Sequence, residues 1–275
     1  MLIIAIETRF KNMFFTNKEY KKFHSNKYML KTLSENIDKH IWLVCAPKSG
    51  STWLTRILKD TLKWDEIKMV PSFGNREQEI DLSCLLSKGA SGNVLTPHQH
   101  CRYSAYTHEI IDALDTKVIF QVRDIFDTIL SFYDHIEMEG PTFPSGFMNE
   151  KSWALMDELT RYEYLVDLVI PWYFNFYCSW MSSSLHSEGR LKIITYNELR
   201  NETVNTVAGV LKYCGEGESA SKVQGVLDKQ KKKKKNTRQN KGVVGRGDSL
   251  PEHLKERVRS YTKYYPHVDF GPMGL

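Results

Sequence analysis

The chain has 275 residues, of which 41% are hydrophobic, and a formal net charge of +5. This apolar fraction is enough for a sizeable core, and ordinary solubility accounts for the charge. The five cysteines are scattered and contain no C-x-x-C pair, which argues against a disulfide framework or a zinc site and favours a reducing compartment.

Neither apolar stretch of the chain predicts a membrane or secretory segment. The N-terminal run of residues 1–6 is too short for a secretory signal and has no basic start. The stretch 168–181 contains Pro171 and Asn175 and falls short of the ~18 uninterrupted apolar residues of a membrane span. We therefore expect a cytoplasmic protein with no membrane partner.

The first strong structural signal begins at residue 41. Residues 10–40 are polar and mixed, and they predict a helix and a connection into a sheet. Residues 41–46 form an apolar run typical of a buried strand, which breaks at residues 47–50. Apolar residues resume at helical spacing from Trp53 to Leu62. A strand, a tight loop and a helix start build an anion site, where backbone N–H groups and the helix dipole converge and Lys48 adds a full charge.

The order of residues in this loop separates two kinds of phosphate site. A nucleotide-triphosphate P-loop reads G-x-x-x-x-G-K-[ST], with its lysine after the last glycine. Here Lys48 precedes Gly50 by two positions. The order counts against a P-loop kinase, which remains an alternative, as does an ordinary turn with a surface lysine.

A pair of histidines follows the next predicted strand. Residues 71–92 are rich in glycine, serine and charge, and residues 93–96 predict a short strand. His98 and His100 come directly after it. A group that titrates near neutrality suits proton transfer, so His98 is the candidate base and His100 its substitute. Two surface histidines in a loop are the structural alternative.

A second anion motif follows residues 117–122, which predict another buried strand. The strand ends at Arg123, Asp124 is a good helix N-cap, and an apolar stripe at helical spacing follows. Ser131 lies eight residues after Arg123, roughly two helical turns of ~3.6 residues. The two side chains together are able to hold one phosphate.

The C-terminal third continues the strand–helix alternation. Residues 191–195 predict a strand, and a helix after it stops at Gly215. The lysine run 231–235 is expected to be solvated, with no nucleic acid partner, because no aromatic residues interleave with it. Successive βα units predict an α/β fold with a central parallel sheet flanked by helices and ligands at the carboxyl ends of the strands.

The loop Pro47-Lys48-Ser49-Gly50-Ser51-Thr52-Trp53 resembles the phosphosulfate-binding loop of sulfotransferases that use 3′-phosphoadenosine 5′-phosphosulfate (PAPS). The resemblance implies that Lys48 and the following amides of Ser49 and Gly50 bind the 5′-phosphosulfate. Ser51 and Thr52 would donate hydrogen bonds to it, and Trp53 would stack on adenine. No metal is needed in this scheme.

Three further segments resemble motifs of the same family. Arg123-x7-Ser131 resembles its 3′-phosphate signature, and Thr96-Pro97-His98 resembles its Lys-Thr-His segment, with Thr96 in place of the lysine. Residues 240–248 resemble its Arg-Lys-Gly-x-x-Gly-Asp segment, so that Lys241 and Gly242 carry over while Asn240 replaces the arginine. Whether Arg238 or Arg246 takes over that charge is open. Tyr196 matches the family tyrosine near the adenine.

The family resemblance implies a single domain, 1–275, with a P-loop-like sulfotransferase fold. Residues 1–40 would be a lead-in, and 41–275 a core that includes a cofactor-closing loop at 236–248. PAPS would give its sulfo group to a hydroxyl or nitrogen of a small-molecule acceptor and leave as adenosine 3′,5′-bisphosphate (PAP). More narrowly, the sequence resembles bacterial, cyanobacterial-type sulfotransferases of saxitoxin pathways, which act on a carbamoyl nitrogen. A non-catalytic nucleotide-binding protein of the same fold is the remaining alternative.

Overall fold

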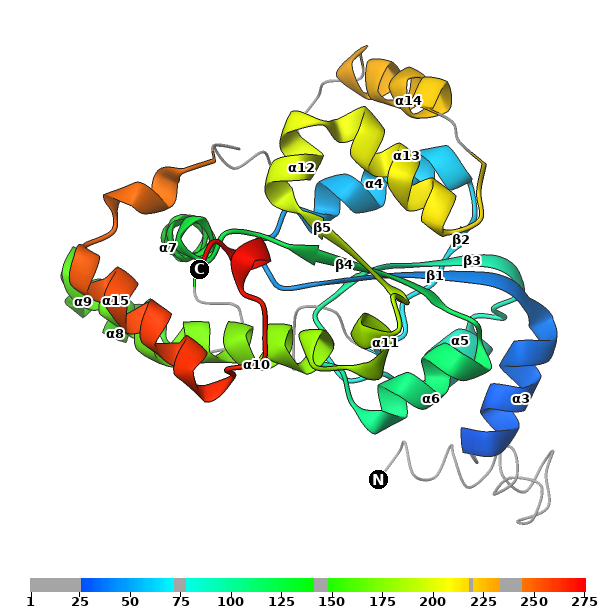
Figure 1. Ribbon diagram of the computed structural model, residues 1–275, viewed down its shortest axis with the longest axis horizontal. Helices are drawn as coiled ribbons and strands as arrows, with labels where there is room; N and C mark the ends of the chain where they lie inside the picture. The colour runs from blue at the N-terminus through cyan, green and yellow to red at the C-terminus, as the bar shows by residue number, and fades with distance from the viewer. Residues whose placement is uncertain (1–25, 72–77, 141–147, 218–219, 233–243) are drawn as a thin grey trace.

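Five parallel strands form the central sheet in the order β2-β3-β1-β4-β5 (Figure 1). The computed structural model describes residues 26–71, 78–140, 148–217, 220–232 and 244–275. The strands are β1 Ile37–Cys45, β2 Asp65–Glu66, β3 Gly92–Gln99, β4 Lys117–Val122 and β5 Leu191–Thr195. The α/β fold predicted from the sequence is confirmed.

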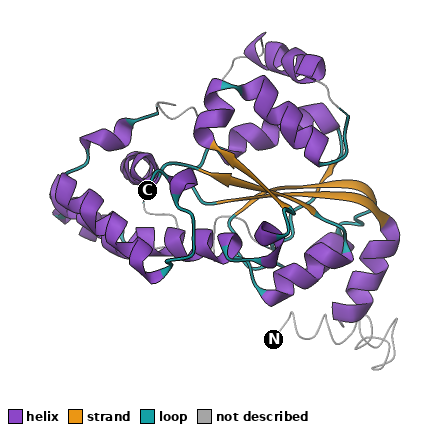
Figure 2. Ribbon diagram, viewed as in Figure 1, coloured by secondary structure: helices purple, strands orange, loops and turns teal. Residues whose placement is uncertain are grey.

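Helices cover both faces of the sheet and form a three-layer domain (Figure 2). One layer contains α4 Ser51–Leu62, α12 Tyr196–Asn201, α13 Thr203–Tyr213 and α14 Ala220–Lys232. The opposite layer contains α3 Asn26–Asn36, α5 Ser83–Ser87, α6 Ala105–Ala113, α10 Ile170–Met181 and α11 Ser184–Ser187. Every helix in the described part of the chain is too short or too polar to span a bilayer.

The remaining helices gather at one end of the molecule (Figure 1). They are α7 Ile125–Glu139, α8 Glu150–Leu155, α9 Glu158–Tyr164 and α15 Glu252–Ser260. Short helical turns occupy Leu165–Val169, Arg246–Ser249, Tyr261–Tyr264 and Gly271–Met273. As predicted, Asp124 caps α7, because its carboxylate accepts a hydrogen bond from the Asp127 N–H. Gly215 lies just past α13 with a φ of +73°, in agreement with its predicted role as a helix stop.

The first strand begins four residues earlier than the sequence predicted. β1 starts at Ile37, which is buried, but the next two residues, Asp38 and Lys39, are exposed. Because these two residues are polar, the continuous apolar run from which the strand was predicted begins only after them. Helix α3 leads into β1 directly and buries Met29 and Leu33 in the core.

The third strand is longer than predicted, so the expectation that His98 follows it is wrong. β3 continues through Pro97 and His98 to Gln99. Opposite it, Trp42 of β1 pairs with Thr96 and Val44 with Gln99, so β3 holds one extra residue at this point. A bulge is one of the places where a strand accepts a proline, because proline has no N–H for the ladder. The bulge breaks the sequence pattern without ending the strand.

Candidate active site

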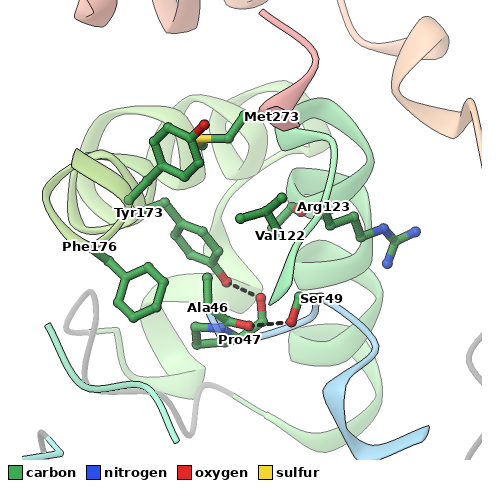
Figure 3. A pocket seen from close by; sticks show the side chains of 10 residues that line it. Ala46, Pro47, Ser49, Val122, Arg123, Tyr173, Phe176 and Met273 are labelled. Atoms are coloured by element: carbon green, nitrogen blue, oxygen red, sulfur yellow. Dashed lines mark hydrogen bonds between the residues drawn. The ribbon is translucent and has the colours of Figure 1, made fainter. Parts of the chain in front are cut away.

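Side chains from other elements hold the loop after β1 by donating hydrogen bonds to its backbone carbonyls. The Tyr173 hydroxyl donates to the Pro47 carbonyl at 2.7 Å (Figure 3). The Arg123 Nη1 donates to the Lys48 carbonyl at 3.1 Å, and the Gln121 Nε2 donates to the Ser49 carbonyl at 2.8 Å. Three consecutive carbonyls are thus fixed from α10, β4 and the end of β4.

Fixing the carbonyls also fixes the amides. In a planar trans peptide the N–H points opposite to the C=O, so the N–H groups of Lys48, Ser49 and Gly50 face away from these three donors. Helix α4 begins at Ser51 and adds the N–H groups of its first turn. We refer to residues 47–52 as the anion cradle, because successive amides and a helix N-terminus in this arrangement attract a negative charge.

The backbone of the anion cradle needs glycine at one position. Gly50 has a φ of +83°, and a Cβ placed there would lie 2.6 Å from Cε2 of Tyr196. Lys48 also has a positive φ, 65°, although it is not a glycine. Tyr196, the first residue of α12, therefore packs directly against the loop.

Arg123, the arginine of the second motif, lies beside the anion cradle. Its guanidinium stacks over the Tyr196 ring at 4.5 Å from the ring centre, and its Nη2 is 3.9 Å from Oδ2 of Asp127. Burial lowers the pKa of Arg123, while Tyr196 and Asp127 oppose that shift. Since arginine stays charged in proteins, the fold places a buried cation next to the loop that carries Lys48.

The other predicted cofactor contacts differ in their exposure to solvent, and two of them lie outside the described residues. Ser131 is only 2% exposed within α7. Trp53 is partly buried against the core, with Arg200 5.9 Å from its ring centre, whereas Thr52 is exposed. Lys241 and Gly242 lie outside the described residues.

Both candidate histidines are half-buried at the carboxyl end of β3, with their rings 6.2 Å apart. The His98 Nδ1 lies 2.9 Å from the Thr55 hydroxyl of α4. The His100 Nδ1 lies 2.8 Å from the Cys45 carbonyl, so it carries a proton and donates it, which leaves a lone pair on Nε2. Burial lowers the pKa of His98 to about 3 and that of His100 to about 4, so both imidazoles are neutral at pH 7.

The structure adds supporting residues that the motifs did not indicate. Gln121 is a polar residue inside an apolar strand, and that mismatch was the one available signal. Tyr173 is hidden in an aromatic helix, and Thr55 in an amphipathic one, where neither residue type is unusual. Asp127, next to Arg123, was not distinguished from an ordinary first-turn acid.

The sulfotransferase domain family matches residues 38–265, and the chain belongs to this family. Mouse sulfotransferase SULT7A1, complexed with PAP, superimposes with a TM-score of 0.61 at 19% identity, over 90% of this chain and 91% of that one. Retinol dehydratase, in complex with androsterone and the inactive cofactor PAP, gives 0.55 at 12% identity, over 82% and 80%. At these identities the structures show a shared fold. No curated protein gives a significant match.

Proposed function

We propose that the protein transfers a sulfo group from PAPS to a small-molecule acceptor. The observation that carries the proposal is the anion cradle, whose three carbonyls are held so that its amides point away from the donors, beside the buried guanidinium of Arg123. This arrangement suits a nucleotide with two separate anionic groups. The PAP-bound structures that share the fold support the same donor.

In the proposed reaction the acceptor oxygen or nitrogen attacks the sulfur of PAPS. The bond between sulfur and the bridging phosphate oxygen breaks, PAP leaves, and the acceptor proton passes to a base. Lys48 stabilises the negative charge that grows on the phosphate oxygens. The amides of Ser49 and Gly50, with Ser51 and Thr52, hold the 5′ group.

The remaining contacts of the donor are assigned by the family resemblance. Trp53 and Tyr196 border the adenine. Arg123 and Ser131, together with Lys241 and Gly242, bind the 3′-phosphate.

His98 is the proposed base, with His100 as the alternative. A base must be unprotonated to accept a proton, and the lowered pKa of each histidine keeps it so at pH 7. A sulfo group arriving beside them carries negative charge, which would raise their pKa and strengthen them as bases. This linkage would switch the base on as the donor binds.

The acceptor is proposed only as a class, a small molecule with a hydroxyl or nitrogen, including a saxitoxin-like carbamoyl. Two acids able to attract a cationic acceptor, Glu137 and Asp134, each have an arginine partner in the chain. Glu137 is 3.0 Å from Nη1 of Arg161, and Asp134 is 2.6 Å from Nη1 of Arg246. The proposed site of action is the reducing cytoplasm, which suits five buried cysteines that form no disulfide.

The test incubates the full chain with PAPS and a panel of alcohols, phenols, guanidines and carbamates, followed by mass spectrometry. A product heavier by one sulfo group is expected, and its absence across the panel, with no PAP binding, would overturn the proposal. PAP binding without turnover would support a non-catalytic nucleotide-binding protein. Magnesium-dependent ATP turnover would support a kinase.

Matched variants test the proposed roles. Lys48→Met should lower the rate about 100- to 1000-fold. Lys63→Met is its control, because Lys63 has nearly the same positive φ, 62°, but caps the far end of α4. His98→Ala should abolish transfer, whereas His108→Ala on α6 should not. If His100→Ala abolishes transfer while His98→Ala does not, His100 is the base.

A further inference from the structure

One buried carboxylate fastens a distant turn to the start of α7. Asp127 is 1% exposed. Its Oδ2 accepts the Gly245 N–H at 3.0 Å, and its Oδ1 accepts the Gly247 N–H at 2.8 Å. Residues 245–247, here called the docked turn, therefore lie beside α7 (Figure 1).

Two further features make this docking specific. Gly247 is buried, and a Cβ there would collide with Cβ of Phe126 and lie 2.9 Å from the Asp127 backbone nitrogen. Between the two glycines, Arg246 donates to Asp134 on the same helix at 2.6 Å. All three residues of the docked turn thus contact α7, and no side chain fits at its innermost position.

The same carboxylate reaches the candidate active site. Oδ2 of Asp127 lies 3.9 Å from Nη2 of Arg123, and Nη1 of Arg123 donates to the Lys48 carbonyl. A continuous set of contacts therefore runs from the anion cradle through Arg123 and Asp127 to the docked turn. Arg246 is close enough to Arg123 for its positive charge to lower the pKa of Arg123.

We infer that Asp127 is a positioning residue that couples nucleotide binding at Arg123 to attachment of the docked turn. An anion drawn to Arg123 also relieves the repulsion between the two arginines, so binding and docking favour each other. Coupling of this kind is reciprocal. The identity of the ligand rests on the proposed function, but the docking does not.

An ordinary role for Asp127 makes different predictions. An acid in the first turn of a helix stabilises that helix through its dipole. If that were all, its loss would lower the melting temperature but leave ligand affinity and the docked turn unchanged. Affinity and local opening therefore separate the two roles.

The binding experiment compares Asp127→Asn, Gly247→Ala and a control in the full chain, with PAP titrated by calorimetry. Both variants should weaken PAP binding about tenfold, as the loss of one or two charge-assisted hydrogen bonds would. With an active acceptor, KM for PAPS should rise while kcat changes less than twofold. Gly247→Ala disturbs the docked turn by placing a Cβ against Phe126, and it leaves the Asp127 carboxylate in place. Unchanged affinity in both variants would overturn the inference.

The control is Asp167→Asn, another acid-to-amide change. Asp167 accepts two hydrogen bonds from Arg257, at 3.1 and 2.9 Å, and within the described part of the chain it has no hydrogen bond or ion pair with the docked turn or the anion cradle. It should bind PAP as the wild type does. An equal loss in this control would mean that the effect is not specific to Asp127 and would overturn the inference.

Limited trypsin digestion tests the docking without relying on activity. Cleavage after Arg246 requires the docked turn to open, so it should be faster in Asp127→Asn and Gly247→Ala, and PAP should slow it in the wild type. Equal cleavage rates in all proteins would overturn the inference. If PAP fails to bind the wild type, the proposed function fails and the coupling with it, while faster cleavage would still establish the docking.

Discussion

At the scale of single residues, Gly50 shows how backbone conformation and packing act together. Its φ of +83° costs a side chain about 1–2 kcal/mol, and Tyr196 occupies the space that a Cβ would need. Gly50→Ala should add that strain to the folded state and also displace Tyr196 from the anion cradle. We expect reduced stability in urea unfolding and weakened PAP binding in calorimetry.

Gly189→Ala is the matched control for this prediction. Gly189 has a similar φ of +69°, but nothing lies within 4 Å of its missing Cβ. It should show the backbone strain alone, with PAP affinity unchanged. If both variants bind PAP as tightly as the wild type, the packing of Tyr196 on Gly50 has no part in binding.

The sequence reveals the charged residues of the site better than their supports. Lys48 and Arg123 each follow a buried strand and precede a helix, and that signal is local. Tyr173 and Asp127 act on partners far along the chain, the Pro47 carbonyl and the Gly247 amide. No pattern within a short window encodes such pairs, because only the folded sheet brings them together.

At the scale of elements, α10 supports the anion cradle with one hydroxyl. The Tyr173 and Tyr177 side chains are both buried, one helical turn apart. Tyr173 donates to the Pro47 carbonyl, while Tyr177 donates to the Asp269 carbonyl at 2.6 Å. Tyr173→Phe and Tyr177→Phe should each cost about 1 kcal/mol in urea unfolding. Only Tyr173→Phe should weaken PAP binding, and equal affinities would contradict a supporting role for α10.

The strands illustrate which element boundaries a sequence encodes. β4 and β5 match their predicted ranges, because their apolar runs end at polar or charged residues that also end the strands. β2 was not predicted, since Asp65 and Glu66 are exposed and acidic and join the sheet only through backbone pairing with β3. Pairing of this kind leaves no apolar pattern to find.

At the scale of the whole molecule, buried neutral histidines tie the sheet to its surroundings. His40 of β1 lies 2.8 Å from the Thr116 hydroxyl on one side and 2.8 Å from the Thr96 hydroxyl of β3 on the other. This contact gives the fully buried Thr96 hydroxyl a hydrogen-bond partner. Burial lowers the pKa of His40 to about 4, as it does for His98 and His100.

These three histidines predict an acid-sensitive fold. Their folded-state pKa values lie below the usual 6.5, so the unfolded chain binds more protons between these limits. The stability that the neutral histidines contribute is complete above about pH 6.5. It is lost as the pH falls toward 4 for His40 and His100 and toward 3 for His98. Each histidine contributes a slope of about 1.4 kcal/mol per pH unit within that window.

Urea unfolding of the full chain between pH 5 and 7.5 measures this slope. His40→Asn should reduce it by about one histidine's share, whereas His253→Asn, at an exposed position on α15, should leave it unchanged. Because both variants keep the same carboxylates, comparing them at each pH cancels the carboxylate contribution. A stability that does not fall between pH 6.5 and 5 would mean that the buried histidines gain protons without unfolding, and that the sheet opens to water more readily than its packing implies.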